Sequence, residues 1–351
     1  MPPPTSRDIR STKICLSEEC DPVLPRPIGE VMIAPRHPMK VSPYKRLEKA
    51  FKRAYLKPLT LVRYGTLKPE RAKLHGSNHW IYIDAGDPCA IKKVVEEPLR
   101  GKVSENLIFW RDFTRHLSPD LIVDVGLNYG ECMFGTDYPE KAELFGFEAN
   151  PRLIPHLEKS KAGHPAADRM TITNCLVSDS PAEDIPFFVN PDWSGSSSAI
   201  REMNSRPQSL EFKLPARTID SVVSLDNARG KTLLFKMDIE GYESKALRGF
   251  VEILAAVKAS VGFIEFDAQY ITWAGQSPME YLGWLQQRFH TYRIASIKGK
   301  TLKKVDGFAG LPKLHGDPNR VHTDLVLIGK QTPDGWLAPE WTILDSRPAK
   351  V

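Results

Sequence analysis

Hydrophobic residues occur in short, nearly continuous runs over the last two thirds of the chain, and amphipathic segments separate several of them. A strand buried on both faces reads as a continuous apolar run, whereas a surface helix repeats its apolar residues every three or four positions. The pattern predicts a mostly parallel sheet with helices on both faces. The expected strands are LIVDVG (121–126), ELFGFEAN (143–150), MTITNCLVS (170–178), TLLFKMDI (232–239), SVGFIEFD (260–267), TYRIASI (291–297) and TDLVLIGK (323–330).

Helical spacing of apolar residues fills several of the intervals between these strands. Ser104 is well placed to cap the helix that precedes the first strand. The interval from 185 to 224 departs from the alternation, with two short strand-like runs around the Ser-rich stretch WSGSSSA. The expected helices are SENLIFWRDFTRHLS (104–118), PRLIPHLEKSKA (151–162), YESKALRGFVEILAAV (242–257) and SPMEYLGWLQQRF (277–289).

The N-terminal part has a different character. Residues 1–40 are rich in proline and lack an apolar period, so we expect them to be poorly ordered. We expect residues 41–103 to form a basic extension and residues 104–351 to form the α/β domain. Eleven Lys or Arg residues stand against two Glu between positions 40 and 73, which indicates an anionic partner. The helix predicted within residues 44–57 either docks on the main domain or makes a peripheral membrane contact.

The composition is that of an ordinary globular protein. Hydrophobic residues make up 41% and charged residues 26% of the chain, as in ordinary soluble proteins. The start has no apolar segment of the signal-peptide kind, and we expect a cytoplasmic protein. The five cysteines do not suggest a disulfide framework, and Cys15 and Cys20 lack the further ligands that a zinc site needs.

The end of the first predicted strand, DVGLNYG, carries the first candidate site. Gly126 and Gly130 allow a tight turn and close approach of the backbone to a ligand. The spacing is not GxGxxG, and Asp124 would repel a pyrophosphate. Glu148, at the end of the next strand, stands where dinucleotide-binding folds hydrogen-bond ribose hydroxyls. Together these residues indicate a cationic nucleoside without pyrophosphate, and S-adenosylmethionine fits that description.

A second group of polar residues ends the strands TLLFKMDI and VGFIEFD. Lys236, Asp238 and Glu240 alternate at the end of the first, and Glu265 and Asp267 at the end of the second. Buried charges are costly unless they are paired or used. A salt bridge of Lys236 with one acid explains part of the group, and the whole predicts a functional cluster.

These same segments carry a family resemblance. LIVDVGLNYGE, LFGFEANP, ITNCLVSD and above all FKMDIEGYESKALRG followed by FIEFD resemble the FkbM family of S-adenosylmethionine-dependent methyltransferases, over residues 105–297 and the last strand. The resemblance implies a Rossmann-like, class I methyltransferase fold with a seven-stranded, mostly parallel sheet that ends in an antiparallel hairpin. It also implies O-methylation, usually of sugars or of secondary metabolites.

Residue roles follow from the resemblance by position. The donor-binding residues it implies are Asp124, Gly126, Asn128, Gly130, Glu148, Asn174, Ser178 and Asp179. Asp238 and Glu240 would face the transferred methyl group and the acceptor. One of them is the first choice for a general base, with Glu265 and then His322 as alternatives. The same acids could instead hold Mg²⁺, which favours oxygen ligands.

The long segment 298–322 between the last two strands predicts an acceptor-binding loop. Its basic residues favour an anionic acceptor such as a nucleotide sugar. Three other functions stay open: a non-catalytic binding module with the same fold, a nicotinamide oxidoreductase and a nucleic-acid methyltransferase. The glycine spacing argues against the second, and the lack of an aromatic-interleaved basic platform argues against the third. The basic residues of the segment are Lys298, Lys300, Lys303, Lys304, Lys313 and Arg320, together with His315 and His322.

Overall fold

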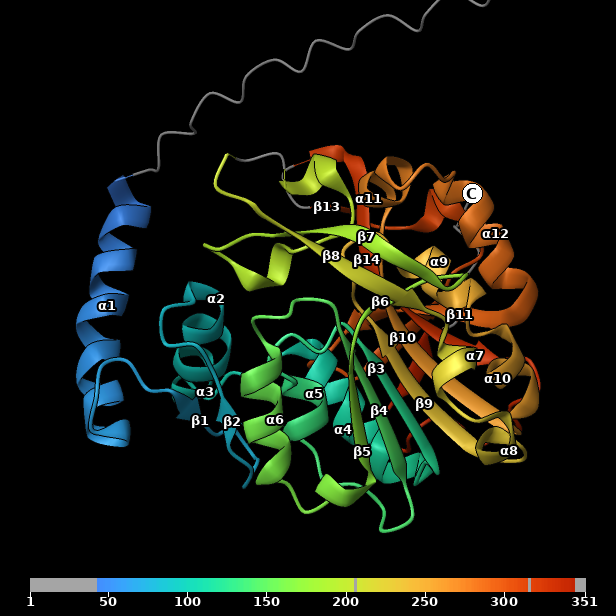
Figure 1. Cartoon of the computed structure of the whole chain (residues 1–351), viewed down its shortest axis with the longest axis horizontal. Coiled ribbons are helices and arrows are strands. Elements are labelled where there is room, and N and C mark those ends of the chain that lie inside the picture. The colour runs from blue at the N-terminus through green and yellow to red at the C-terminus, as the bar shows by residue number, and fades with distance from the viewer. Residues whose placement is uncertain (1–42, 205–206, 315–316, 345–351) are drawn as a thin grey trace, which may run out of the picture. The chain divides into compact units, whose positions relative to one another are not determined.

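The computed structural model describes residues 43–204, 207–314 and 317–344 (Figure 1). Within this part, the residues from Ala50 onward form one compact unit. Cys15, Cys20, His315 and the expected disorder of residues 1–40 lie outside the described residues. No helix in the described ranges is long and apolar enough to cross a membrane.

The central sheet has ten strands among the described residues, in the order β15-β12-β11-β14-β10-β9-β3-β4-β5, with β13 paired to β14. The five strands from β5 to β10 are parallel, and β14 runs antiparallel to both β10 and β11. The predicted class I arrangement is therefore confirmed: all seven expected strands and the antiparallel pairing of β11 with β14 are present, and the short strands β12, β13 and β15 extend the sheet beyond the prediction. The strands are β3 (Leu121–Val125), β4 (Glu143–Glu148), β5 (Met170–Asn174), β9 (Thr232–Met237), β10 (Ala259–Asp267), β11 (Phe289–Ser296), β12 (Thr301–Lys304), β13 (Lys313–Leu314), β14 (Asp317–Gly329) and β15 (Thr342–Leu344).

The segment 298–322 is therefore not the long loop expected from the sequence. Residues 301–304 form β12, which pairs with β11 and with β15, and β14 begins already at Asp317. The alternation in TLKK is too short to be recognised as a strand without its partner.

Two apolar cores lie on opposite faces of the sheet (Figure 1). One joins helices α4, α5 and α6 to the sheet, and the other joins α7, α8, α9, α10, α11 and α12 to it. The predicted cap of α4 is present, because Ser104 Oγ accepts a hydrogen bond from the Leu107 amide at 3.3 Å. The helices are α4 (Glu105–Leu117), α5 (Glu131–Phe134), α6 (Ile154–Ala162), α7 (Ile219–Val222), α8 (Leu225–Ala228), α9 (Glu243–Arg248), α10 (Val251–Ala256), α11 (Ala268–Trp273) and α12 (Pro278–Arg288).

The helix expected over 242–257 is broken into α9 and α10 at Gly249. A Cβ atom at Gly249 would lie 2.0 Å from the Ser178 carbonyl oxygen. The break lets the chain pass close to Ser178. This contact joins distant segments, so the spacing of apolar residues within 242–257 could not predict it.

A small second sheet, in the order β6-β8-β7, follows β5. It comprises β6 (Leu176–Val177), β7 (Ala182–Val189) and β8 (Leu210–Arg217), and the turns η3 (Ser194–Ser196) and η4 (Arg201–Asn204) lie in the connection between β7 and β8. The two extra strands predicted in this interval are confirmed.

The N-terminal extension contains α1 (Pro43–Tyr64), β1 (Arg71–Ala72), β2 (Ile81–Tyr82) and a continuous helical stretch made of α2 (Pro88–Ala90), the π-helix η1 (Ile91–Glu96) and α3 (Glu97–Leu99). Residues 72–95 of this extension contribute side chains to the same core as α4 and α6. The boundary expected at residue 103 therefore does not separate two structural units. Past the middle of α1, Tyr55, Leu61 and Val62 are exposed, so a peripheral membrane contact of this helix stays a prediction.

Candidate functional site

A cavity of about 350 Å³ opens at the carboxyl ends of β3, β4, β9 and β10. In open α/β sheets ligands bind at this edge, and the volume is in the range of small-molecule sites. Asp124, Asn128, Glu148 and the acids at 238, 240 and 265 all line it. The cavity therefore joins the two groups of polar residues that the sequence singles out.

The glycine turn after β3 has the conformation that the sequence predicts. Gly126 and Gly130 have φ of +81° and +76°, and Asn128 lies in the same left-handed region at +52°. A Cβ atom at Gly126 would lie 2.0 Å from the carbonyl oxygen of Asp238. Glycine is needed there both for its φ angle and for the close approach of the two strand ends.

Glu148 holds this turn in place. Its Oε2 accepts a hydrogen bond from the Asn128 amide and its Oε1 one from the Asn150 amide, each at 2.7 Å. Burial raises the pKa of Glu148 to about 7, although the two amides oppose the shift. Each carboxylate oxygen can accept a second hydrogen bond, so the side chain can still receive ribose hydroxyls from the cavity.

Asp124 lies beside Lys236 in the register of β3 and β9. The Lys236 ammonium is 3.4 Å from Asp124 Oδ1, 3.1 Å from the Gly126 carbonyl oxygen and 3.8 Å from Asp238 Oδ2. Burial raises the pKa of Asp124 to about 6, and Lys236 limits the rise. The salt bridge considered from the sequence is thus present, and it ties the donor turn to the acid cluster.

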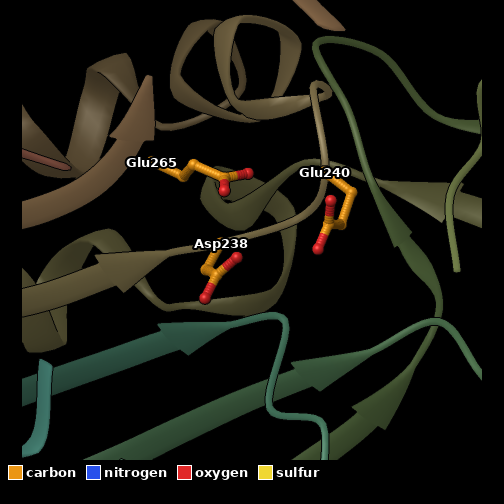
Figure 2. A group of neighbouring side chains, drawn as sticks. All are labelled: Asp238, Glu240 and Glu265. Atoms are coloured by element: carbon orange, nitrogen blue, oxygen red, sulfur yellow. The ribbon is translucent and has the colours of Figure 1, made fainter. Parts of the chain in front are cut away.

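Three carboxylates form that cluster. Asp238 and Glu240 follow β9, and Glu265 comes from β10; one oxygen of each lies within 4.8 Å of one oxygen of the other two (Figure 2). Burial and mutual repulsion raise the pKa of Glu240 and of Glu265 well above the ordinary range. The same environment raises the pKa of Asp324, the cross-strand partner of Glu265, to about 7.

Other predicted residues lie elsewhere. The Asn174 amide donates to the carbonyl oxygens of Glu148 and Ala149 at 2.7 and 3.1 Å. Ser178 Oγ contacts Asp179 at 3.2 Å. None of the three lines the cavity, whose wall at the end of β5 consists of Cys175, Leu176 and Val177. We therefore assign a supporting role to Asn174 and none in donor contact to Ser178 or Asp179.

His322 pairs with Asp267 and does not line the cavity. Its Nδ1 is 3.0 Å from Asp267 Oδ2, and this hydrogen bond raises its pKa. Arg320 contacts the same carboxylate, with Nε 2.8 Å from Oδ2. An imidazole that is bonded to Asp267 and lies outside the cavity lining is poorly placed as a general base, so the structure does not favour that role for His322.

The basic residues of segment 298–322 also lie away from the cavity. Lys303 and Lys304 are exposed on β12, and Lys300 contacts Asp112 at 2.6 Å. Arg320 is occupied by Asp267. None of these residues lines the cavity, and the argument from this segment for an anionic acceptor therefore has no structural support.

Two segments of the cavity wall were not expected from the sequence. The N-terminal extension supplies Leu74, Lys93 and Val103, and the Ser-rich connection supplies Ser194 and Gly195. Hydrogen bonds link both to the glycine turn: Tyr129 donates to Asp87 at 3.0 Å, and Ser194 donates to Asn128 at 3.2 Å. The carboxylates of Glu131 and Asp238 raise the pKa of Lys93, although burial opposes the shift. No local pattern in the sequence indicates that these two segments reach the cavity.

The raised pKa of Glu148 predicts the pH dependence of donor binding. Below pH 7 the carboxyl is increasingly protonated and loses acceptor capacity, so affinity for S-adenosylhomocysteine should fall by about tenfold per pH unit below that value. Burial also raises the pKa of Asp124, to about 6, so protonation of Asp124 adds to the loss of affinity at lower pH. Calorimetric titration between about pH 5.5 and 8.5 measures the effect. Glu148→Gln should flatten the profile, and a flat wild-type profile would count against the donor role.

Comparison with known proteins identifies the family. Residues 124–294 match the model of the methyltransferase FkbM domain. No curated protein matches the chain in sequence. Solved structures that match parts of this chain include an FkbM methyltransferase from Methylobacillus flagellatus (16% identity, 60% of this chain, TM-score 0.34) and the O-methyltransferase TomG from Streptomyces achromogenes (11% identity, 69% of this chain and 90% of that one, TM-score 0.34). The matched region spans 44% of the Methylobacillus protein.

Proposed function

Because residues 124–294 belong to the FkbM methyltransferase family, we propose that this protein transfers a methyl group from S-adenosylmethionine to a hydroxyl of a sugar, glycan precursor or secondary metabolite. One observation carries the proposal: the carboxylate of Glu148 and the acids Asp238, Glu240 and Glu265 open into a single cavity. A donor held by its ribose at Glu148 thus shares its cavity with groups able to accept a proton.

The charge of the cavity supports a cationic donor. Three lysines line it, namely Lys93, Lys102 and Lys236. Seven carboxylates line it, namely Glu97, Asp124, Glu131, Glu148, Asp238, Glu240 and Glu265. Such a surplus of negative charge favours the sulfonium and ammonium groups of S-adenosylmethionine and disfavours an anionic acceptor. We therefore propose a neutral hydroxyl compound as the acceptor, in place of the anionic one that the basic segment 298–322 had indicated.

Methyl transfer is an in-line displacement in which the new oxygen–methyl bond forms as the methyl–sulfur bond breaks and the sulfonium becomes a neutral thioether. Much of the acceleration comes from aligning the three reacting atoms. The acceptor proton passes to a carboxylate of the cluster. Glu240 is the first choice, because its carboxyl group lines the cavity and burial raises its pKa, which makes its carboxylate a stronger base. Asp238 is the second.

Glu240→Gln is expected to lower kcat by about a hundredfold, the usual contribution of a general base, while S-adenosylhomocysteine affinity stays within twofold of wild type. Label transfer from S-adenosylmethionine to matched acceptors measures it, for example glucose, glucuronic acid and glucose 6-phosphate. Glucose, which is neutral, should react faster than glucuronic acid and glucose 6-phosphate, which are anionic. Glu211→Gln, an exposed carboxylate paired with Arg201, is the control. Unchanged kcat in Glu240→Gln would remove Glu240 from the mechanism.

A further inference from the structure

The ion pairs that the acid cluster makes among the described residues are long, and the positive groups in them have other partners. Lys236 is 3.8 Å from Asp238 and already contacts Asp124 and the Gly126 carbonyl. His322 is 3.9 Å from Glu265 and hydrogen-bonded to Asp267. Glu240 has no ion pair within the described ranges. Even for partly buried carboxylates such weak pairing is unfavourable.

Glu265 adds a second observation, an oxygen atom without a hydrogen bond in the described part of the chain. Only 15% of its side-chain surface is exposed. Its Oε2 is fully buried and has no hydrogen-bond partner among the described residues. A buried, unpaired carboxylate oxygen costs the whole desolvation of that atom, and the carboxyl group points toward Asp238 and Glu240 (Figure 2). The atom thus faces the cluster without a protein donor to satisfy it.

The geometry suits a small divalent ion. Three oxygens within 4.8 Å of one another can surround a central ion at roughly the 2.0–2.6 Å that Mg²⁺ and Ca²⁺ require after small side-chain adjustments. Asp238 and Glu240 follow the end of β9 and Glu265 lies in β10, so two neighbouring parallel strands bring the three residues together. The Glu240 carbonyl is further fixed by the Ser198 hydroxyl at 3.0 Å.

We propose that Asp238, Glu240 and Glu265 bind a divalent cation of the Mg²⁺ class at the acceptor end of the cavity. The site itself stands on these three residues, and only its role in catalysis rests on the proposed function. There the ion would bind the acceptor oxygen and favour loss of its proton. The proton would then pass to a solvent water, because Glu240 would be a ligand of the ion and not the general base. The oxygen then takes the methyl group as the sulfur becomes a neutral thioether.

Direct binding of Mn²⁺, used as a spectroscopic probe for Mg²⁺, tests the site without any acceptor. Loss of the free-ion electron paramagnetic resonance signal should show one bound ion per chain. Glu265→Gln and Asp238→Asn should each weaken binding by at least about tenfold, since even an outer-shell change has that effect. Glu252→Gln removes an exposed carboxylate of α10 and should bind as wild type does. Mg²⁺ and Ca²⁺ should displace Mn²⁺.

Failure of this proposal is separable from failure of the proposed function when S-adenosylhomocysteine is titrated in the same samples. Donor binding without Mn²⁺ binding, or with Mn²⁺ binding unchanged in both cluster variants, overturns the metal site alone. Loss of Mn²⁺ binding in both variants, with donor binding retained, establishes it. Absence of donor binding in wild type would instead overturn the proposed function, whatever the ion does.

Discussion

Glu148→Ala is expected to weaken S-adenosylhomocysteine binding by about a hundredfold or more, because hydrogen bonds to a charged group contribute about 1.5–3 kcal/mol each and two ribose hydroxyls would be lost. The variant also removes the acceptor of the Asn128 and Asn150 amides, so the glycine turn loses its anchor. Calorimetric titration of the purified variant measures the change.

The matched control for this variant is Glu158→Ala. Glu158 lies exposed on α6, close in sequence to Glu148 but away from the cavity lining. It should bind S-adenosylhomocysteine as wild type does. Equal affinity of Glu148→Ala and Glu158→Ala would show that the donor does not use this carboxylate.

Gly126→Ala should destabilise the protein and abolish donor binding. The new methyl group would lie 2.0 Å from the Asp238 carbonyl oxygen, and separating the ends of β3 and β9 disturbs both halves of the cavity. Overpacking of this kind costs about 1–3 kcal/mol, in addition to about 1–2 kcal/mol for an alanine in the left-handed conformation. Urea denaturation gives the free energy of unfolding.

Gly230→Ala separates the two contributions. Gly230 has φ of +67°, and a Cβ atom there meets nothing within 4 Å. Gly230→Ala should lower the free energy of unfolding only by the cost of an alanine in the left-handed conformation, and it should keep donor binding. If both alanine variants lose the same free energy of unfolding, the close approach at Gly126 has no energetic importance.

The strand ends of the site could be predicted because the relevant signals are local. Asp124, Gly126 and Glu148 each follow an apolar run, and a parallel sheet brings such ends to one edge. The same reasoning predicts that the acids at the ends of β9 and β10 lie together. The structure places one oxygen each of Asp238, Glu240 and Glu265 within 4.8 Å of one another.

The remaining parts depend on contacts between distant segments. Lys93 belongs to a π-helix without an apolar period, and nothing in its sequence places it at the cavity. The pairing of β14 with β10 places His322 opposite Asp267, and this register decides that His322 is paired and not a free base. Lys303 and Lys304 become strand residues only because β11 and β15 flank them. Composition of the segment alone suggested a binding loop.

We expect the cavity to bind a cationic nucleoside donor and not a pyrophosphate. Titration of the wild-type protein with S-adenosylhomocysteine and, separately, with NAD⁺ tests it most directly. The structure predicts micromolar binding of S-adenosylhomocysteine and no measurable binding of NAD⁺, whose pyrophosphate would meet Asp124 and the acid cluster. Tighter binding of NAD⁺, or no binding of S-adenosylhomocysteine at millimolar concentration, would show that the cavity is not a site for this donor.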